Sequence, residues 1–178
     1  MKHRLVMAWL CVGGLGGCGQ RGATSTEGEL RSVSAPSSNV AGDTLDRMDA
    51  RAPVPLLPMM AHHQKQSMRD HLVAVQQIVA AVAADDLPTA EKAALRIGFS
   101  ESMGQMCSHM GAGAPGFAQQ ALAFHRTADG IGAAARDGDR AKLLAALSAT
   151  LEACTTCHAA WKQQVVDQAT WDRLTRLQ

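Results

Sequence analysis

The residues whose types and spacing could do chemistry are Cys154, Cys157 and His158, which form the pattern C-x-x-C-H near the end of the 178-residue chain. Two thiols three positions apart lie on one side of a helical turn, where both could add across the vinyl groups of a single porphyrin. The imidazole that follows would then lie against the ring with a nitrogen available to iron. The pattern is a signature of haem c attachment, and it predicts one covalent haem c with His158 as the proximal axial ligand.

Two other interpretations of this pattern are weaker. A redox-active C-x-x-C of the thioredoxin type needs a βαβ context, and nothing in the sequence has the pattern of a strand. A chance match would need two cysteines and a histidine, all uncommon residues, to fall in register. Covalent haem is therefore the preferred interpretation.

Apolar residues recur at helical spacing in four segments, which predicts four amphipathic helices. The predicted helices cover about 58–84, about 89–110, the stretch from the turn at 111–115 to about 136, and a last helix from the N-cap Asp139 onward. Four such helices with short connections favour an all-α fold, an antiparallel up-down four-helix bundle with haem c on the last helix.

The core faces of the first and last predicted helices follow from the same spacing. On the first helix the predicted face is Ala61, Gln64, Met68, Leu72, Val75, Val79 and Val82. On the last helix it is Leu144, Leu147, Leu151, Cys154, His158, Trp161 and Val165. The C-x-x-C-H motif is therefore expected on the same side as the core leucines, as a haem wedged into a bundle requires.

The N-terminus has the pattern of an export signal. Lys2 and Arg4 precede an apolar run over 5–12 that is too short to span a bilayer. The run ends at Leu-Gly-Gly-Cys over 15–18, which resembles the lipobox of bacterial lipoproteins. That resemblance implies a signal peptide over 1–17 and lipidation of Cys18; the alternative is an ordinary secretory signal with an incidental cysteine.

The predicted location is the periplasm, with the mature chain lipid-anchored to a membrane. Haem c is attached outside the cytoplasm in bacteria, so this location supports the interpretation of the motif as a haem attachment site. Gly19 stands where an aspartate would retain a lipoprotein at the inner membrane, which favours the outer membrane. Residues 18–52 are rich in Gly, Ser, Thr, Ala and Pro and predict a flexible tether, followed by a cytochrome-type domain over 53–178.

Composition excludes some partners and leaves others open. Lys and Arg number 17 against 16 Asp and Glu, so no basic field argues for nucleic acid. Aromatic residues make up only 3% of the chain, so either a bound macrocycle or alanine-rich packing must fill the core. Apart from Cys11 in the signal, Cys18 and the motif pair, only Cys107 remains, so no disulfide framework is implied.

A four-helix domain with C-x-x-C-H on its last helix resembles the class II c-type cytochromes, the cytochrome c-prime group and its low-spin, methionine-ligated relatives. The resemblance covers about 58–166. Besides the motif, it rests on Trp161 and Lys162 just after it, where Arg is commoner than Lys, and on Met68, which falls where the low-spin relatives carry their axial methionine.

The resemblance implies a monohaem protein that carries single electrons between Fe(III) and Fe(II), with redox proteins as partners and no enzymatic activity. Met68 would be the distal axial ligand, and Leu72, Trp161 and Lys162 would line the haem pocket. Many family members are dimers, so a homodimer stays open, although no interface can be identified in the sequence. No acid–base pair, nucleophile or open metal triad argues for an enzyme.

The sixth position of the iron has three interpretations. Met68 is either the ligand or an ordinary core methionine. His71, one turn further on, is the best substitute ligand, although a hydrogen-bonded surface imidazole is the preferred role for it. A vacant position would make the chain a five-coordinate haem protein that binds NO or CO.

Besides an electron carrier and a gas-binding haem protein, a third possible function is that of a copper-binding helical bundle. Met103, Met106, Cys107 and Met110 share one broad face of the second predicted helix, with His109 nearby, and soft ligands of this kind suit copper(I). The same spacing is that of a buried core, which we favour. His62 and His63 are expected to point away from the core, as solvated side chains or adventitious metal ligands.

Overall fold

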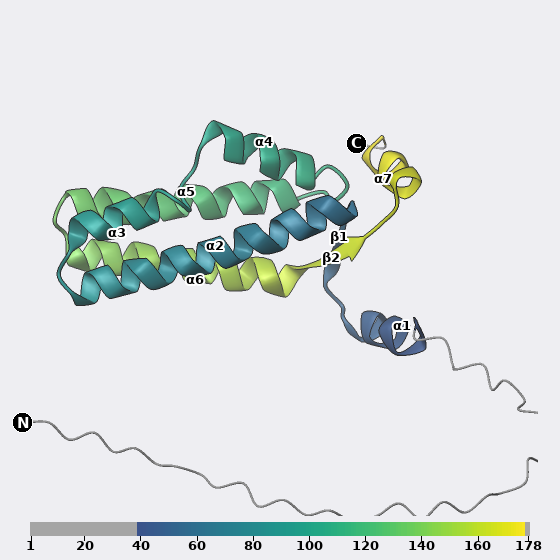
Figure 1. Ribbon diagram of the computed structural model, residues 1–178, viewed down its shortest axis with the longest axis horizontal. Coiled ribbons are helices and arrows are strands. Elements are labelled where there is room, and N and C mark those ends of the chain that lie inside the picture. Colours follow the sequence, from purple (N-terminus) through teal and green to yellow (C-terminus); the bar gives the residue numbers. More distant parts are fainter. Residues whose placement is uncertain (1–38, 177–178) are drawn as a thin grey trace, which may run out of the picture. The chain divides into compact units, whose positions relative to one another are not determined.

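A computed structural model of the chain describes residues 39–176 (Figure 1). The predicted signal peptide, Cys18 and the first part of the predicted tether lie outside these residues. The chain separates into two units, 1–43 and 44–178, and the described part of the first unit is only the start of helix α1. All packing described here is within the second unit.

Seven helices and two short strands account for most of the described residues, so the chain is mostly helical. In chain order they are α1 (Asn39–Met48), β1 (Ala52–Leu56), α2 (Pro58–Ala83), α3 (Leu87–Ala94), α4 (Glu101–Met110), α5 (Phe117–Arg136), α6 (Arg140–Ala160), β2 (Trp161–Val165) and α7 (Gln168–Thr175). Among residues 39–176, none of the helices is both long and apolar enough to cross a membrane.

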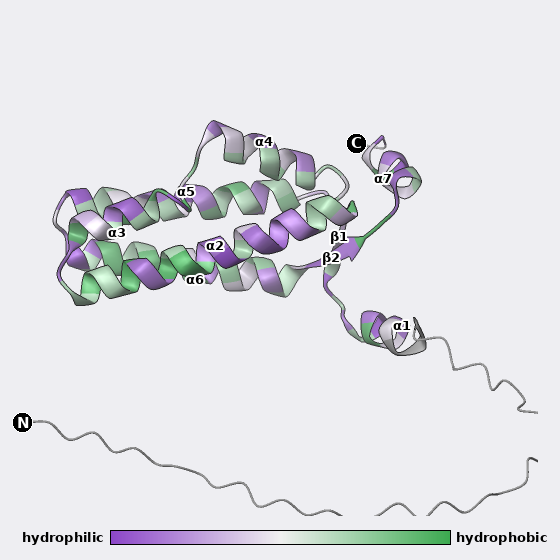
Figure 2. Cartoon of the chain, in the orientation of Figure 1, coloured by the Kyte–Doolittle hydropathy of each residue, from purple (hydrophilic) through white to green (hydrophobic). Residues whose placement is uncertain are grey.

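Helix α2 begins and ends as the sequence predicts. Pro58 occupies its first turn, where the missing N–H has no partner to lose. After Ala83, Asp85 has a φ of 60° and turns the chain, and Asp86 caps α3 by accepting a hydrogen bond from the Thr89 N–H at 3.0 Å. Polar residues dominate the first half of α2 and apolar residues its second half (Figure 2). The second half therefore supplies most of the buried side chains of this helix.

The single helix predicted over 89–110 is wrong, because the chain breaks between α3 and α4. Side chains from α5 satisfy the backbone groups that the break releases. Asp129 Oδ1 accepts from the Phe99 N–H at 2.9 Å, and the His125 ring nitrogen Nδ1 lies 2.8 Å from the carbonyl oxygen of Ile97. Ser100 then caps α4, its Oγ accepting from the Met103 N–H at 3.2 Å.

Helices α5 and α6 follow the predicted segments and are joined by a tight turn. Gly138 has a φ of 71°, a conformation that favours glycine, and Asp139 caps α6 by accepting from the Lys142 N–H at 2.9 Å. This confirms Asp139 as the N-cap. Helix α6 packs along α5, and α3 packs against both α2 and α5.

Buried side chains form two clusters. The large core cluster lies among α2, α3, α5 and α6 and consists of Ala74, Ile78, Ala81, Val82, Ala90, Ala93, Ala94, Ile97, Phe124, Ala128, Ile131, Ala134, Ala135, Leu143 and Leu147. The small core cluster lies among β1, α2, α4 and α5 and consists of Val54, Leu56, Ala61, Met110, Ala114 and Phe117. Many of these side chains are alanine, so helices approach closely where they do meet.

The last predicted helix stops earlier than expected, and the chain continues as a strand. Strands β1 and β2 pair in parallel, with Ala52 opposite Trp161 and Leu56 opposite Val165. Pro53 and Pro55 hold β1 extended, and a proline is tolerated here because each strand has only one neighbour. Burial of Val54 and Leu56 in the small core cluster stabilises the pair. The expectation that the sequence holds no strand was therefore wrong.

Two further helices lie at the ends of the described region. Helix α1 falls within the segment predicted to be a flexible tether, so residues 39–48 are helical where no regular structure was expected. Helix α7 is capped by Asp167 and buries Trp171.

Candidate functional site

The C-x-x-C-H motif occupies the last turns of α6. Cys154 and Cys157 are free and partly buried, whereas His158 is exposed. Cys154 packs against the large core cluster and Cys157 against the small one. The two thiols therefore point inward on the same side of α6, at the place where the two clusters meet.

Burial raises the pKa of both motif thiols. The neighbouring Cys154 raises the pKa of Cys157 further. At neutral pH both groups are therefore protonated thiols, and a low thiolate fraction slows their oxidation to a disulfide. The arrangement keeps two S–H groups available, three residues apart, on one side of a helix.

The end of α6 is fixed by residues from the opposite end of the described chain. Arg51 donates from Nη1 to the carbonyl oxygens of His158, at 3.2 Å, and of Trp161, at 3.4 Å. Lys162 donates from Nζ to the carbonyl oxygens of Asp46, at 2.9 Å, and Asp49, at 3.0 Å. The carbonyls of His158 and Asp46 lie at the C-terminal ends of α6 and α1, where they have no partner within the helix. The positive groups of Arg51 and Lys162 supply these partners. We call Asp49, Arg51 and Lys162 the clasp.

Asp49 orients the guanidinium of the clasp. Its Oδ2 lies 2.7 Å from Arg51 Nη2, and its Oδ1 accepts from Arg51 Nε at 2.9 Å. The hydrogen bonds from Arg51 lower the pKa of Asp49 to about 2, so the carboxylate is charged at every physiological pH. The sequence analysis placed Asp49 and Arg51 in the tether and so missed their role. No local signal indicates that Arg51 would bond to His158, which is 107 positions away.

The predicted core faces of α2 and α6 are only partly buried. Met68 is 39% exposed and Leu72 70% exposed on α2, and Leu144 and Leu151 are 48% and 41% exposed on α6. We call these four residues the apolar edge. The correction has a simple cause: α2 packs on α3, α6 packs on α5, and the backbones of α2 and α6 make few close approaches to one another.

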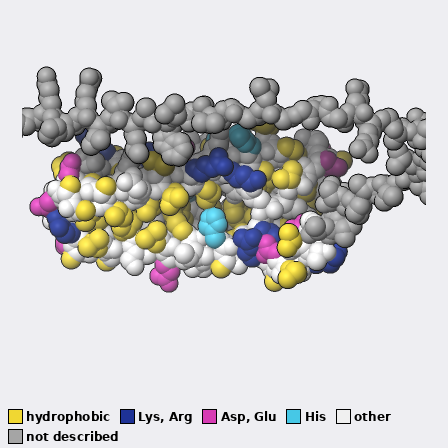
Figure 3. Space-filling model, turned by 60° about the horizontal axis from the view of Figure 1, so that its bottom comes forward, with side chains coloured by type: hydrophobic (Ala, Val, Ile, Leu, Met, Phe, Trp, Pro, Cys, Tyr) yellow, Lys and Arg dark blue, Asp and Glu magenta, His cyan; other side chains and the backbone are white. Residues whose placement is uncertain are grey.

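Figure 3 shows hydrophobic side chains gathered over the face of the molecule that lies along the bottom of Figure 1. The residues that α2 and α6 do bury, such as Ile78 and Leu143, lie on neighbouring positions of the same helices. A solvent-exposed group of large apolar side chains is informative in a protein many of whose core positions are filled by alanine. Among the described residues, packing of the helices leaves 39–70% of each of the four residues of the apolar edge exposed.

His71 lies in an aromatic cluster rather than as a hydrogen-bonded surface imidazole. Its ring stacks on Phe124 with 5.2 Å between centroids and meets the edge of His125 at 5.4 Å. Burial, reinforced by His125 and opposed by Asp70, lowers the pKa of His71 to about 4. The imidazole is therefore neutral at pH 7, with one ring nitrogen whose lone pair a metal could use.

The other predicted pocket residues follow the motif in β2, not in a helix. Trp161 donates from Nε1 to Gln120 Oε1 at 2.7 Å, and its ring meets the edge of Phe117 at 5.7 Å. Lys162 belongs to the clasp. Neighbouring Gln163 donates to the carbonyl oxygen of Ala61 at 3.3 Å, so the start of α2 lies beside the end of α6.

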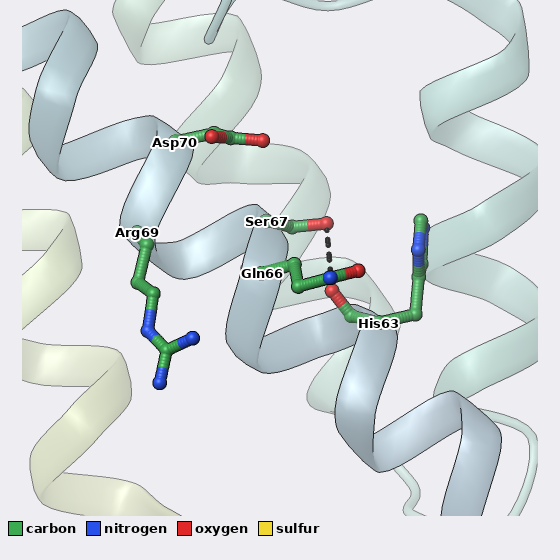
Figure 4. A pocket seen from close by; sticks show the side chains of 5 residues that line it. All are labelled: His63, Gln66, Ser67, Arg69 and Asp70. Atoms are coloured by element: carbon green, nitrogen blue, oxygen red, sulfur yellow. Dashed lines mark hydrogen bonds between the residues drawn. The ribbon is translucent and has the colours of Figure 1, made fainter.

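A surface hollow of about 350 Å³ lies on α2 and is lined by His63, Gln66, Ser67, Arg69 and Asp70 (Figure 4). Its lining is polar and comes from one helix. Ser67 Oγ donates to the carbonyl oxygen of His63 at 3.2 Å, which ties the side chain to its own helix. The hollow contains no motif residue, so it is not the candidate site.

The sulfur-containing side chains of α4 differ in burial. Cys107 and Met110 are buried, which agrees with the preferred core interpretation, while Met103 and Met106 are partly buried. The ring of His109 meets Trp171 at 5.9 Å. Within residues 39–176, no group of three or more His, Cys, Asp or Glu side chains is placed to hold a metal ion.

Comparison with known proteins identifies no relative of the chain. No protein-family model matches it, and neither a curated protein nor a solved structure is similar enough to count as a match.

Proposed function

We propose that this chain is a monohaem c-type cytochrome that transfers single electrons, with α2, α3–α4, α5 and α6 acting as a four-helix bundle around the haem. Cys154 and Cys157 would carry the haem through two thioethers, and His158 would be its proximal axial ligand. Bound haem c would supply a one-electron couple between Fe(III) and Fe(II). The resemblance to class II cytochromes supports the proposal at the motif and in the order of the helices.

One observation carries the proposal: two inward-facing thiols of a C-x-x-C-H motif lie at the end of a helix whose neighbouring large apolar side chains are exposed. Met68, Leu72 and Leu151 are residues that a protein would normally bury. A porphyrin fixed to Cys154 and Cys157 is a flat apolar body that could cover them. The donor set and the uncovered apolar edge therefore both suit a covalently bound macrocycle.

The other residues of the site would hold and shield the group. Leu72 and Trp161 would exclude water from the ring, and Lys162 would hold the end of the helix that carries it. The pKa of His71, lowered by burial, keeps a neutral imidazole available on α2. Met68 is our proposed distal ligand because a thioether on the iron raises the reduction potential and suits electron transfer; His71 is the substitute.

The proposed setting is the periplasm. The charged n-region, the short apolar run and Cys18 support a lipid-anchored protein, with the outer membrane favoured over the inner one. Its partners would be redox proteins that dock near the haem edge.

The visible spectrum of protein exported together with a haem-ligation system tests the ligand assignment. We expect a low-spin spectrum with a weak sulfur-to-iron band near about 695 nm, typical of methionine ligation. Met68→Leu should convert it to a high-spin spectrum that shifts on addition of CO. Met59→Leu is the matched control, since Met59 lies on the same helix and is 74% exposed.

Two results would replace this assignment. A low-spin spectrum that survives Met68→Leu and is lost in His71→Leu would make His71 the ligand. A wild-type spectrum that is already high-spin and responds to CO would favour the alternative, a five-coordinate protein that binds NO or CO.

A further inference from the structure

Two soft donor atoms face each other across the seam between α2 and α4. The Nε2 atom of His63 lies 3.2 Å from Sδ of Met106, although the residues are 43 positions apart. Figure 4 shows His63 reaching from α2 toward the neighbouring helix, away from Arg69. A thioether is a weak hydrogen-bond acceptor, so a histidine with free access to water gains little from this contact alone.

The separation of these atoms suits a shared metal ion. Typical bonds of a metal to imidazole nitrogen and to sulfur are about 2.0–2.1 Å and about 2.3 Å. An ion bonded to both atoms would hold them about 3.2–3.8 Å apart for bond angles of about 95–120°. The observed 3.2 Å is at the short end of this range. His63 is exposed, so an ion could reach this pair of atoms from solvent.

The thioether of Met60 is the candidate third donor. Met60 precedes His63 by three positions on α2, so the two side chains share a face of that helix. Met60 and Met106 both pack, partly buried, against the small core cluster. Both thioethers therefore pack on the same cluster, and the exposed His63 contacts one of them, Met106.

We propose that Met60, His63 and Met106 form a binding site for copper(I). All three ligands are neutral, and thioether sulfur with imidazole selects a soft, low-charge ion over zinc, magnesium or calcium. The site uses neither the motif thiols nor Cys107, whose pKa is raised by burial and which lies within the core. It is independent of haem attachment, and it places the metal at α2 and α4 instead of on the face of α4 alone.

Titration of the purified, exported protein with tetrakis(acetonitrile)copper(I) under nitrogen, against bicinchoninate as competitor, tests this site. We expect one equivalent to bind, and at least about tenfold weaker binding in His63→Ala, in Met106→Leu and in Met60→Leu. Methionine-to-leucine changes conserve volume, so the fold should persist, which circular dichroism would verify. X-ray absorption should show one nitrogen and two sulfur neighbours.

Matched controls come from the adjacent exposed positions. His62→Ala and Met59→Leu should bind copper(I) as the wild type does, since both side chains are solvated. The double variant Cys154→Ser/Cys157→Ser, which cannot carry haem, should also bind unchanged, so haem attachment and copper binding are tested separately. The proposal is overturned by wild-type affinity in both His63→Ala and Met106→Leu, by loss of binding in the double cysteine variant, or by no stoichiometric binding in the wild type.

Discussion

The guanidinium of Arg51 donates a hydrogen bond to the main-chain carbonyl of His158 at 3.2 Å, across 107 residues of sequence. The proposed axial histidine is thus held from the N-terminal side of the domain, where the predicted tether ends. Asp49 orients the arginine. Lys162 adds hydrogen bonds in the other direction, from β2 to the carbonyl oxygens of Asp46 and Asp49. The clasp therefore connects the segment leading from the proposed membrane anchor to the end of the helix that would carry the haem.

Arg51→Ala should loosen the end of α6 and strand β2. The carbonyls of His158 and Trp161 lose a charged donor, so amide hydrogen exchange in residues 161–165 should become faster, and the free energy of unfolding should fall. Arg47→Ala is the control, because Arg47 bonds only to Thr44 within its own helix. Equal exchange rates in β2 for both variants and the wild type would show that the clasp does not hold the helix end.

His71 makes the stability of the haem-free protein depend on pH. Burial lowers its folded-state pKa to about 4 from an unfolded value of 6.5, so the unfolded chain binds a proton more readily. Stability should therefore be complete above about pH 6.5 and fall as the pH drops toward 4, by at most about 3 kcal/mol from this residue, reduced by the partial solvent access of the ring.

Denaturant unfolding of Cys154→Ser/Cys157→Ser protein between pH 4 and pH 7 measures this dependence. Adding His71→Phe should flatten the curve in that window. His125 also has a pKa lowered by burial, so some slope should remain. An unchanged slope after the His71 substitution would show that the ring is not a buried neutral imidazole.

The side chain of Leu72 should contribute to the free energy of unfolding only when haem is present. In haem-free protein its side chain is 70% exposed, so Leu72→Ser should change the free energy of unfolding by no more than about 0.5 kcal/mol. If haem covers it, the same substitution should cost about 1–2 kcal/mol in haem-loaded protein. Leu95→Ser is the control at a similarly exposed leucine in the turn that follows α3. Equal costs for Leu72→Ser in the two forms would place the haem elsewhere.

The break between α3 and α4 depends on the missing side chain of Gly98. A Cβ atom at this position would lie 2.5 Å from Asp129 Oδ1, which accepts the hydrogen bond of Phe99. Gly98→Ala should therefore destabilise the protein by about 1–3 kcal/mol. Gly130→Ala, where a Cβ would meet only Ala146 at 3.5 Å within a helix, should be neutral or stabilise by up to about 1 kcal/mol. Thermal unfolding of both variants checks this contrast.

Local signals were enough to place α2, α5 and the start of α6. Pro58, the cap at Asp139 and the apolar period of the segments between them are properties of neighbouring residues, and α2, α5 and the start of α6 agree with them. The break in the second predicted helix could not be inferred, because Asp129 and His125 act on residues about thirty positions away. Strand β1 escaped notice because its partner, β2, has no strand pattern of its own.

The sequence was enough to identify the candidate site residues but not how deeply their neighbours are buried. The C-x-x-C-H pattern identifies Cys154, Cys157 and His158, and in the structure both thiols lie on one side of α6. Periodicity placed Met68, Leu72 and Leu151 in a core, whereas packing of α2 on α3 and α6 on α5 leaves them exposed. An apolar period identifies residues that avoid water, and it does not distinguish a helix neighbour from a bound group.

Covalent haem on Cys154 and Cys157 is the claim on which the rest of the account depends. Its most direct test is the intact mass of the exported protein made with a haem-ligation system, measured together with a pyridine haemochrome assay. The account predicts one haem per chain, none in Cys154→Ser/Cys157→Ser, and an unchanged yield in Cys107→Ser. Colourless wild-type protein with both motif thiols free would contradict it.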